Sequence, residues 1–392
     1  MGRHLVLAGG GHAHLTTLLR TGEITSRGHQ VTVVGPSPYH YYSGMAPGMV
    51  SGHYRPQQIR FHIRKMVVDR GGRFIEDRIE DIRPREKELV LASGITIPYD
   101  TVSFNIGSEV PTGRIVREGR NIFTVKPIEN LLRGRLALEA LHRDQPAGEE
   151  IAVCVVGGGP AGVELAGSVW ALTQRLQRPS RITLLTGGKL LGRLPRRVRD
   201  LAFESLASRG VAIHEDVPVE EITAGSVKME DGQAIDSLIT FVAVGVKPSS
   251  LFRNTEVPAG DDGGLLVNNR LQSVDFPEIF GGGDCVTLEG DPLARVGVYA
   301  VRQNPVLFHN LLASLEGTPL TVFEPGSPSF LLILNMGDGT GILRKGKWIY
   351  QGRLAFRLKD WIDRRFMKRY QVSGELEEEL GNIQRSPEFS SR

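Results

Sequence analysis

The residues best suited to bind a ligand form a glycine-rich run near the middle of the chain. Residues 157–162 read Gly-Gly-Gly-Pro-Ala-Gly, which completes a G-x-G-x-x-G pattern. The six residues before it are apolar, as in a strand buried on both faces, and a helical pattern follows it. In this order the first glycine permits a tight turn, the second lets the backbone approach a pyrophosphate, and the third lets helix and strand pack closely. We therefore expect a dinucleotide to be held by Gly157, Gly158, Gly159, Pro160, Ala161 and Gly162; an ordinary glycine-rich turn is the alternative.

A second, less complete copy of this pattern lies close to the N-terminus. An apolar run at residues 4–8 leads into Gly9-Gly10-Gly11, and His14 stands where the third glycine is expected. Two such units in one chain imply two nucleotides, and the usual pair is FAD and NAD(P)H. The strand predicted at 30–34 ends at Gly35 rather than at the acidic residue that holds a ribose. Backbone groups or Ser37 must then take that role.

Composition limits the remaining classes of protein. A chain of 392 residues suggests two to three domains, and a net charge of +3 is unremarkable for its length. Its two cysteines, Cys154 and Cys285, make no disulfide framework and favour a reducing compartment. No run approaches the roughly 20 apolar residues of a spanning helix. We expect a cytoplasmic protein without a metal site and without a nucleic-acid partner.

The elements that must position these motifs can be read in order along the chain. Residues 38–54 are rich in aromatic residues, glycine and proline, and their pattern fits neither helix nor strand, so we predict a ligand-contacting loop. Short strands follow between 73 and 106, and a helix is expected over 128–142. In the second unit, the strand at 181–185 ends at Thr186, again without a carboxylate. Lys189, Arg193, Arg196 or Arg197 could therefore accommodate a 2′-phosphate, or they are simply solvated charges.

The predicted fold class is α/β, with two Rossmann-like dinucleotide-binding domains and a small C-terminal α+β domain. We expect Thr186 and Gly245, which end strands of the second unit, to contact NAD(P)H. The predicted divisions are 1–125 and 249–324 for the two parts of the FAD-binding domain, 126–248 for the NAD(P)H-binding domain, and 325–392 for the C-terminal domain.

These motifs make the chain resemble FAD-dependent pyridine nucleotide oxidoreductases of the two-dinucleotide-domain type. It is most similar to type II NADH dehydrogenases, and closer still to the NADH-dehydrogenase-like module associated with selenophosphate synthetase. The more specific stretches are Ser-Gly-Met-Ala-Pro-Gly at 43–48 and Asp-Trp-Ile-Asp-Arg-Arg-Phe at 360–366. The resemblance implies FAD contacts from the first glycine turn, the isoalloxazine surroundings, the adenine pocket and the ribityl-binding turn: Gly9, Gly10, Gly11, His12, Ala13, Pro47, Gly48, Ile79, Gly107, Gly283 and Asp284.

Departures from the family's patterns bear on the electron acceptor. No cysteine occurs before residue 154, so the chain lacks the cysteine pair of disulfide reductases. The quinone motif Ala-Gln-x-Ala-x-Gln of type II dehydrogenases aligns with residues 297–302, where both glutamines are replaced, although Gln303 follows. The resemblance places the acceptor site near Tyr299, Arg302 and Gln303.

The implied function is hydride transfer from NAD(P)H to FAD and then electron transfer to a second acceptor, for which a quinone is the first expectation. Glu164 would lie at the junction of nicotinamide and flavin as a candidate catalytic residue, or it is a carboxylate favoured at a helix start. Two alternatives are an oxidoreductase for a small sulfur or selenium compound and a flavin-binding module with little turnover.

A basic amphipathic helix is predicted over 353–370. The spacing predicts one apolar face made of Leu354, Leu358, Trp361, Ile362, Phe366 and Tyr370. Residues 344–369 contain ten Lys or Arg against two Asp, which suits the cytoplasmic surface of an anionic membrane. The alternatives are that the apolar face packs on the protein's own core or on a second subunit in a homodimer.

Overall fold

Two parallel sheets carry the two glycine motifs in this computed structural model, which describes residues 2–113, 115–116, 119–146, 148–291, 293–327 and 329–378. The first sheet has the strand order β21-β9-β1-β2-β5. All its neighbours are parallel, and β1 lies at its centre. Its strands are β1 His4–Ala8, β2 Gln30–Gly35, β5 Arg73–Glu76, β9 Thr101–Phe104 and β21 Ile279–Gly281.

Helices cover one face of this first sheet and a small antiparallel sheet covers the other. The residues of β1 from Leu5 to Ala8 are fully buried, because apolar side chains meet them from both sides. The helical segments of this unit are η1 His12–His14, α1 Leu15–Leu19, α2 Thr21–Ser26, α4 Ile63–Val68, η5 Gly283–Cys285 and α8 Gly297–Glu316. The covering strands are β6 Ile79–Arg83, β7 Glu88–Leu91 and β8 Thr96–Pro98.

The second sheet repeats the first in its arrangement. Its order is β11-β18-β12-β13-β14, all parallel, and β12, which precedes the complete glycine motif, is again central. The strands are β11 Ile122–Thr124, β12 Ile151–Val156, β13 Ser180–Leu185, β14 Ala212–His214 and β18 Ile239–Val242. Around them lie α5 Glu129–Asp144, α6 Pro160–Leu176, α7 Arg196–Ala207 and the small sheet β15 Val219–Ile222, β16 Ser226–Met229 and β17 Ala234–Asp236. The predicted α/β fold with two Rossmann-like units is confirmed.

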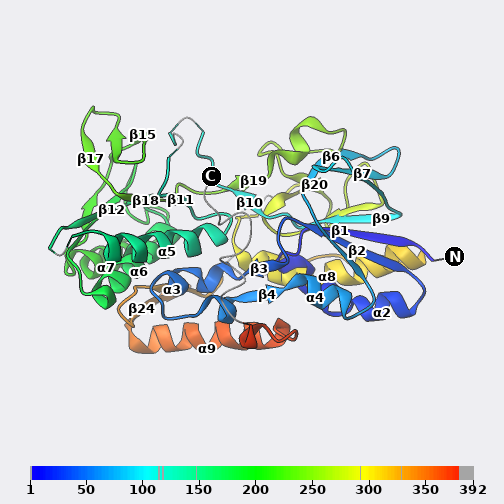
Figure 1. Cartoon of the computed structure of the whole chain (residues 1–392). Helices are drawn as coiled ribbons and strands as arrows, with labels where there is room; N and C mark the ends of the chain where they lie inside the picture. The colour runs from blue at the N-terminus through cyan, green and yellow to red at the C-terminus, as the bar shows by residue number, and fades with distance from the viewer. Residues whose placement is uncertain are drawn as a thin grey trace.

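The two units lie side by side and are joined by crossing segments (Figure 1). β10 Ser108–Glu109, which follows the first sheet, pairs antiparallel with β19 Lys247–Pro248, which follows the second. β11 pairs with β18 in the second sheet although it precedes residue 126, where the sequence divides the units. The exact domain divisions stay predictions. The other paired strands of this region are β20 Leu265–Val267 and β22 Val286–Leu288, and a 3₁₀ turn, η4, spans Ser250–Asn254.

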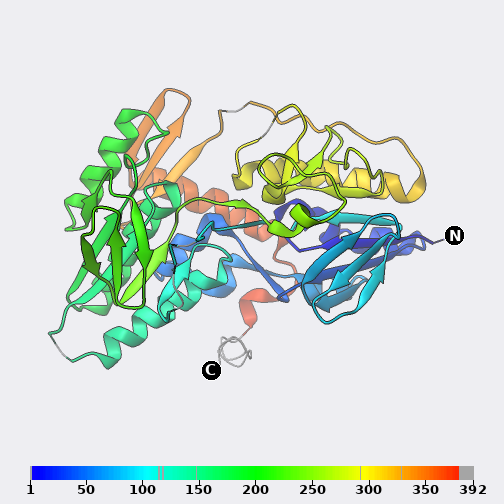
Figure 2. The same cartoon turned by 90° about the horizontal axis from the view of Figure 1, so that it is seen from above.

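The C-terminal part forms a three-stranded antiparallel sheet and one long helix. The strands are β23 Leu332–Asn335, β24 Gly341–Lys345 and β25 Trp348–Gly352, and α9 spans Arg353–Tyr370, as the sequence predicts. Figures 1 and 2 show α9 passing from the second unit toward the first. The segment ends with η6 Glu375–Glu377, and residues 379–392 of the predicted C-terminal domain lie outside the described residues.

The segment 38–54, expected to be an irregular loop, is largely ordered into short elements. It contains β3 Tyr39–Tyr41, η2 Ser43–Met45 and α3 Ala46–Val50. β3 pairs with β4 Arg60–His62, which follows the 3₁₀ turn η3 Pro56–Ile59. Each element is too short to show a period, because three to five residues complete neither two turns of helix nor a clear alternation.

The prediction of one continuous apolar face on α9 is wrong, because the residues of that face are neither all buried nor all exposed. Leu354, Leu358 and Trp361 are exposed, whereas Tyr370 is buried with Ala355, Phe356 and Met367. The buried side also holds Asp363, which is only 4% exposed. The helix therefore packs on the protein with a partly charged face and leaves apolar side chains in solvent. Within the described ranges, no helix has both the length and the apolar character needed to cross a bilayer.

Candidate functional site

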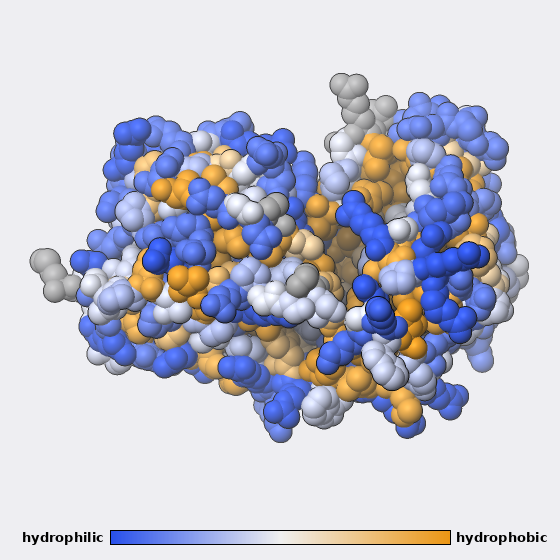
Figure 3. All heavy atoms as spheres, turned by 180° about the vertical axis from the view of Figure 1, so that it is seen from behind, coloured by the Kyte–Doolittle hydropathy of each residue, from blue (hydrophilic) through white to orange (hydrophobic). Residues whose placement is uncertain are grey.

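A cavity of about 520 Å³ opens at the carboxyl ends of the strands of the first sheet. This is the edge where ligands bind in open parallel sheets, and the volume falls in the range of ligand sites. Figure 3 shows apolar side chains on the floor of a hollow where the two units meet. Eight of the residues predicted to contact FAD line the cavity: Gly9, Gly10, Gly11, His12, Ile79, Gly107, Gly283 and Asp284.

The first glycine turn is held by Asn105, which the sequence analysis did not single out. Its side-chain oxygen accepts a hydrogen bond from Ala13 N at 3.0 Å, and its side-chain nitrogen donates to Gly282 O. A side chain at Gly9 or Gly11 would overlap Asn105, and Gly9 has a φ of +85°. These glycines are therefore required by packing against Asn105 even before a phosphate is considered. The visible signal is that Asn105 directly follows β9 at the ligand-binding edge.

His14, in place of the third glycine, is part of the turn's support. One ring nitrogen lies 2.7 Å from Gly9 O, and the other lies 2.8 Å from the Ser103 hydroxyl on β9. The ring is completely buried, and burial lowers its pKa to about 4, so it is neutral at pH 7. A neutral imidazole thus bridges the turn and the neighbouring strand, which compensates for the close packing that a third glycine provides.

Asp284 is fixed on the cavity wall by its neighbours. The Ser108 hydroxyl donates to its Oδ2 at 2.9 Å, and Lys126 Nζ lies 3.8 Å from the same oxygen. The preceding residue, Gly283, donates its N–H to the side-chain oxygen of Gln303 at 2.6 Å. These contacts leave the other carboxylate oxygen of Asp284 to accept a hydroxyl hydrogen bond, as its predicted role requires. That role stays a prediction.

The cavity has two chemically different ends, and together they fit FAD. One end is formed by Gly35, which ends β2, by Ser37, which follows it, and by Phe74 of β5, and this is where a Rossmann unit holds the adenosine. The glycine turn after β1 lies between this end and the other, where Asp284 follows β21 and Lys126 Nζ lies 3.8 Å from its Oδ2. Adenosine, pyrophosphate and isoalloxazine can therefore follow one another along the wall.

Three residues predicted to contact FAD do not line this cavity. Ala13 is fully buried behind the turn, and Pro47 and Gly48 are buried in α3. A side chain on Gly48 would overlap the ring of Tyr54, so this glycine is explained by packing between α3 and the loop that follows it. Their proposed roles at the flavin are untested.

The second glycine turn has the shape that pyrophosphate binding requires. A side chain on Gly157 would overlap Ala243 O, and one on Gly162 would overlap Gly157 O, so turn, strand and α6 pack as closely as backbones can. An added Cβ on Gly159, in contrast, meets no atom within 4 Å. Gly159 is the N-cap of α6, whose free N–H groups favour an anion.

Lys189 and Arg196, two of the basic residues considered as partners for a 2′-phosphate near Thr186, form ion pairs within the protein. Thr186 is buried against Gly158, and Lys189 Nζ lies 3.2 Å from Glu215 Oε2 and 2.5 Å from Asp216 Oδ2. Lys189 is thus held by two carboxylates that follow β14 at the same edge of the sheet. Among the other basic residues considered, Arg196 pairs with Asp200 at 3.6 Å, whereas Arg193 and Arg197 are exposed. Gly245 follows β18 with a φ of +98° and open space around it.

Glu164 lies near a buried group of charges contributed by α9. Its Oε1 accepts a hydrogen bond from Asn335 N at 2.8 Å, which ties α6 to β23. Burial raises the pKa of Glu164 to about 7; the nearby Lys359 and the Asn335 N–H oppose this rise, and Asp363 adds to it. Lys359 Nζ lies 2.7 Å from Asp363 Oδ2 and donates to Gly44 O at 2.6 Å. A carboxyl group that titrates near neutral pH therefore stands where both units and α9 meet.

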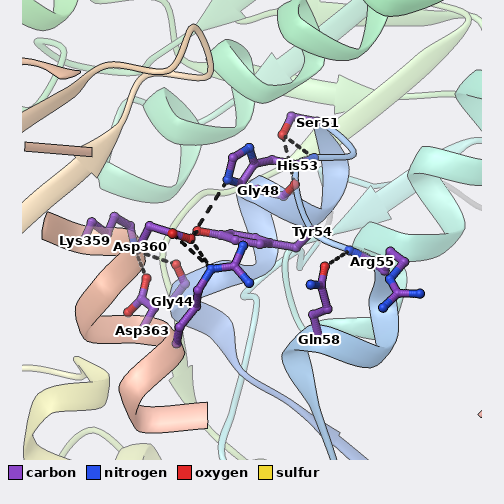
Figure 4. A network of polar contacts seen from close by, with 11 residues as sticks. Gly44, Gly48, Ser51, His53, Tyr54, Arg55, Gln58, Lys359, Asp360 and Asp363 are labelled. Carbon is purple, nitrogen blue, oxygen red and sulfur yellow. Dashed lines mark hydrogen bonds and ion pairs between the residues drawn. The ribbon is translucent and has the colours of Figure 1, made fainter. Parts of the chain in front are cut away.

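A neighbouring set of polar contacts fixes α9 on the first unit. Figure 4 shows Tyr54 reaching Asp360 on α9, with Lys359 turned toward Asp363 and Gly44. The Tyr54 hydroxyl donates to Asp360 Oδ1 at 2.7 Å, and the Tyr42 hydroxyl donates to Asp363 Oδ1 at 2.9 Å. The tyrosines come from the segment 38–54, so its aromatic residues anchor the helix as well as bordering the cavity.

The three residues predicted at the acceptor site serve different purposes. Gln303 is 2% exposed and its oxygen is occupied by Gly283 N, so it positions the turn that carries Asp284. Tyr299 is largely buried near the same turn. Arg302 donates to Pro325 O at 2.6 Å and so holds the segment that leads to β23. Their role in binding an acceptor stays a prediction.

A change at Gly159 separates nucleotide binding from folding. In Gly159→Ala the added methyl group has room in the empty turn but stands where a pyrophosphate would rest, so we expect about tenfold weaker binding of NADH or NADPH. Fluorescence titration measures this change, and FAD content should stay the same. Gly225→Ala, at another open glycine, is the matched control. Unchanged nucleotide affinity in Gly159→Ala would show that the turn does not hold the pyrophosphate.

The raised pKa of Glu164 predicts a pH-dependent stability. Because the folded protein holds this proton more tightly than the unfolded chain, the stabilisation is complete below about pH 4.5 and is lost as pH rises through about 7. Glu164→Gln cannot titrate, so the thermal midpoint of the unaltered protein should fall by a few degrees relative to this variant between pH 5 and 8. Glu204→Gln, at an exposed position on α7, should show no such trend. A pH-independent difference for Glu164→Gln would contradict the assignment.

Comparison with known proteins agrees with this geometry. Residues 3–309 match the family model described as pyridine nucleotide-disulphide oxidoreductase. Demethylphylloquinone reductase NdbB of Synechocystis is 24% identical over 330 residues, covering 81% of this chain and 80% of that protein. Alternative NAD(P)H-ubiquinone oxidoreductase C1 of Arabidopsis thaliana is 25% identical over 360 residues, covering 81% and 68%.

The fold is shared with a solved type II enzyme. The structure of NDH2 from Plasmodium falciparum in complex with NADH superposes with a TM-score of 0.78 over 96% of this chain and 98% of that one, at 13% identity. The matched family model spans both parallel sheets and both glycine turns. The chain therefore belongs to the pyridine nucleotide-disulphide oxidoreductase family.

Proposed function

We propose that the protein oxidises NAD(P)H with FAD as its cofactor and passes the electrons to a quinone. The observation that carries this proposal is the pairing of two nucleotide sites: a glycine turn with a cavity suited to FAD in one unit, and a second glycine turn with an open anion site in the other. The balanced reaction takes NAD(P)H, a proton and a quinone to NAD(P)⁺ and a quinol.

The chain's own residues act mainly by binding and orientation. FAD, when bound, supplies a ring system that accepts a hydride from the nicotinamide and returns two electrons to the acceptor. Gly159 and the α6 N-terminus hold the nucleotide phosphates, and Asp284 and the first glycine turn hold FAD. Glu164, whose pKa of about 7 allows it to carry or release a proton, is the candidate group for proton exchange at the junction.

The two cysteines argue against the disulphide chemistry in the family's name. Cys154 lies within β12 and Cys285 lies in η5, and both are fully buried. Burial raises the pKa of each thiol to about 12, so neither forms the thiolate that attacks sulfur. A quinone acceptor is supported by the names of the relatives, which are reductases of demethylphylloquinone and ubiquinone.

Steady-state oxidation of NADH and of NADPH tests the function directly. The flavin-loaded protein is mixed with either nucleotide and a water-soluble ubiquinone analogue, and the absorbance of the reduced nicotinamide is followed with and without the analogue. We expect quinone-dependent oxidation that falls in Gly159→Ala and persists in Gly225→Ala. Oxidation that needs a small sulfur or selenium compound instead of quinone would favour that alternative. Flavin-loaded protein that oxidises neither nucleotide with any acceptor would indicate a binding module.

We further propose that the protein attaches to an anionic membrane surface, on the cytoplasmic side, through β25 and α9. Trp348, Leu354 and Trp361 are 83%, 64% and 58% exposed, although such side chains are usually buried in soluble proteins. Exposed basic residues stand among them on α9: Arg357, Arg364, Arg365, Lys368 and Arg369. Exposed tryptophan beside clustered positive charge suits the headgroup region of anionic lipid, where the quinone is dissolved.

Liposome binding measures the contribution of these exposed side chains. The variant Trp348→Ser with Trp361→Ser should lose most co-sedimentation with anionic vesicles, and high salt should weaken binding of the unaltered protein. Ile95→Ser removes a comparably exposed apolar side chain from the β7–β8 turn and is the control. Equal vesicle binding by the unaltered protein, the double tryptophan variant and Ile95→Ser would contradict membrane attachment. A dimer in light scattering that dissociates in the double variant would instead assign this face to a second subunit.

A further inference from the structure

A basic residue lies near each of the two ends of the cavity. Arg78, at the adenosine end, is exposed and follows β5 closely. Lys126 stands at the opposite end, past the glycine turn, because its Nζ lies 3.8 Å from Asp284, which follows β21 at the other edge of the sheet. Because the adenosine follows β2, the end with Lys126 is the one left for the isoalloxazine ring of FAD. A positive charge there acts on the part of the cofactor where electrons arrive.

The backbone around Lys126 is held by hydrogen bonds, and its side chain lines the cavity. Lys126 O accepts hydrogen bonds from the Thr124 hydroxyl at 2.6 Å and from Asn130 Nδ2 at 3.4 Å. The side chain is 24% exposed, and its ammonium group lies 3.8 Å from Asp284 Oδ2. The ion pair with Asp284 keeps this positive charge at the cavity wall.

Among the residues that the structure describes, the other titratable groups at this end do not replace that positive charge. His12 and His40 line the same wall, with 3.1 Å between their ring nitrogens. Burial lowers the pKa of His12 to about 3, with Lys126 as a second cause, and burial lowers that of His40 well below its ordinary value. Both rings are therefore neutral at pH 7. Asp284 adds negative charge, and Gly297 begins α8, whose N-terminus is electropositive.

We propose that Lys126 sets the electron affinity of the bound flavin by stabilising the negative charge that hydride transfer brings to the isoalloxazine. A hydride carries two electrons and one negative charge from the nicotinamide, so the flavin becomes one unit more negative in this step. An ammonium group at this place favours that product, and it opposes the carboxylate of Asp284. This inference rests on the proposed function only in requiring bound FAD, since it concerns the charge at the ring and not the acceptor.

Sulfite is a suitable probe because it adds to the flavin ring of many flavoproteins and places negative charge there, as a hydride does. The experiment measures the sulfite dissociation constant from the bleaching of flavin absorbance, and the midpoint potential from equilibration with a reference dye. In Lys126→Met we expect about tenfold weaker sulfite binding and an equivalent change in the reduction equilibrium, which is about 30 mV more negative for a two-electron couple. Lys126→Arg keeps the charge and should restore most of both values.

Matched controls separate this role from general effects. Arg78→Met removes a positive charge from the adenosine end of the same cavity, and it should leave the sulfite affinity and the potential almost unchanged. Unaltered sulfite affinity and potential in Lys126→Met would overturn the proposal. If Lys126→Met and Lys126→Gln both lose FAD while Lys126→Arg keeps it, the ammonium serves to retain the cofactor and the proposal is likewise overturned. Neither result depends on quinone turnover, so the proposed function can fail while this inference holds, or the reverse.

Discussion

A phosphate-rich cofactor can be bound by backbone N–H groups only where no side chain stands in the way, and this constraint organises both units. Each glycine turn follows the central strand of a parallel sheet, so the turn emerges at the ligand-binding edge. In the second unit the backbone approaches so closely that a Cβ on Gly162 would overlap Gly157 O, while Gly159 is left open. A pyrophosphate site needs close packing on the side of the turn that faces the protein and free space on the side where the ligand binds.

The rest of the chain brings the two turns into one functional arrangement. Asn105 links the first turn to the Gly282–Asp284 turn, although these segments are far apart in sequence. α9 joins the units through a buried ion pair of Lys359 and Asp363. The charges of this pair act on the carboxyl group of Glu164. Burying such charges is costly unless they are paired and hydrogen-bonded, as they are here. The C-terminal helix thus contributes to the electrostatics of the junction between the units.

Local patterns predicted the strands and helices that carry the nucleotide sites, because buried strands and glycine turns are specified within a few neighbouring residues. The bounds of β1 and α9 agree with the sequence analysis residue for residue. The roles of Asn105 and Lys126 could not be predicted in this way, since each depends on contacts with segments that are distant in the sequence. The orientation of α9 was missed for a related reason: an amphipathic pattern cannot show that a salt-bridged Asp363 is buried while Trp361 is exposed.

We propose that reduced nicotinamide nucleotide and quinone exchange electrons through one flavin held by the first unit. An anaerobic titration of the purified, flavin-loaded protein with NADH or NADPH, followed by addition of a soluble quinone, tests it most directly. We expect the flavin absorbance to be bleached by about one equivalent of nucleotide per flavin, as a two-electron transfer requires, and to return when quinone is added. A flavin that is not bleached by either nucleotide, or that stays bleached in the presence of quinone, would contradict it.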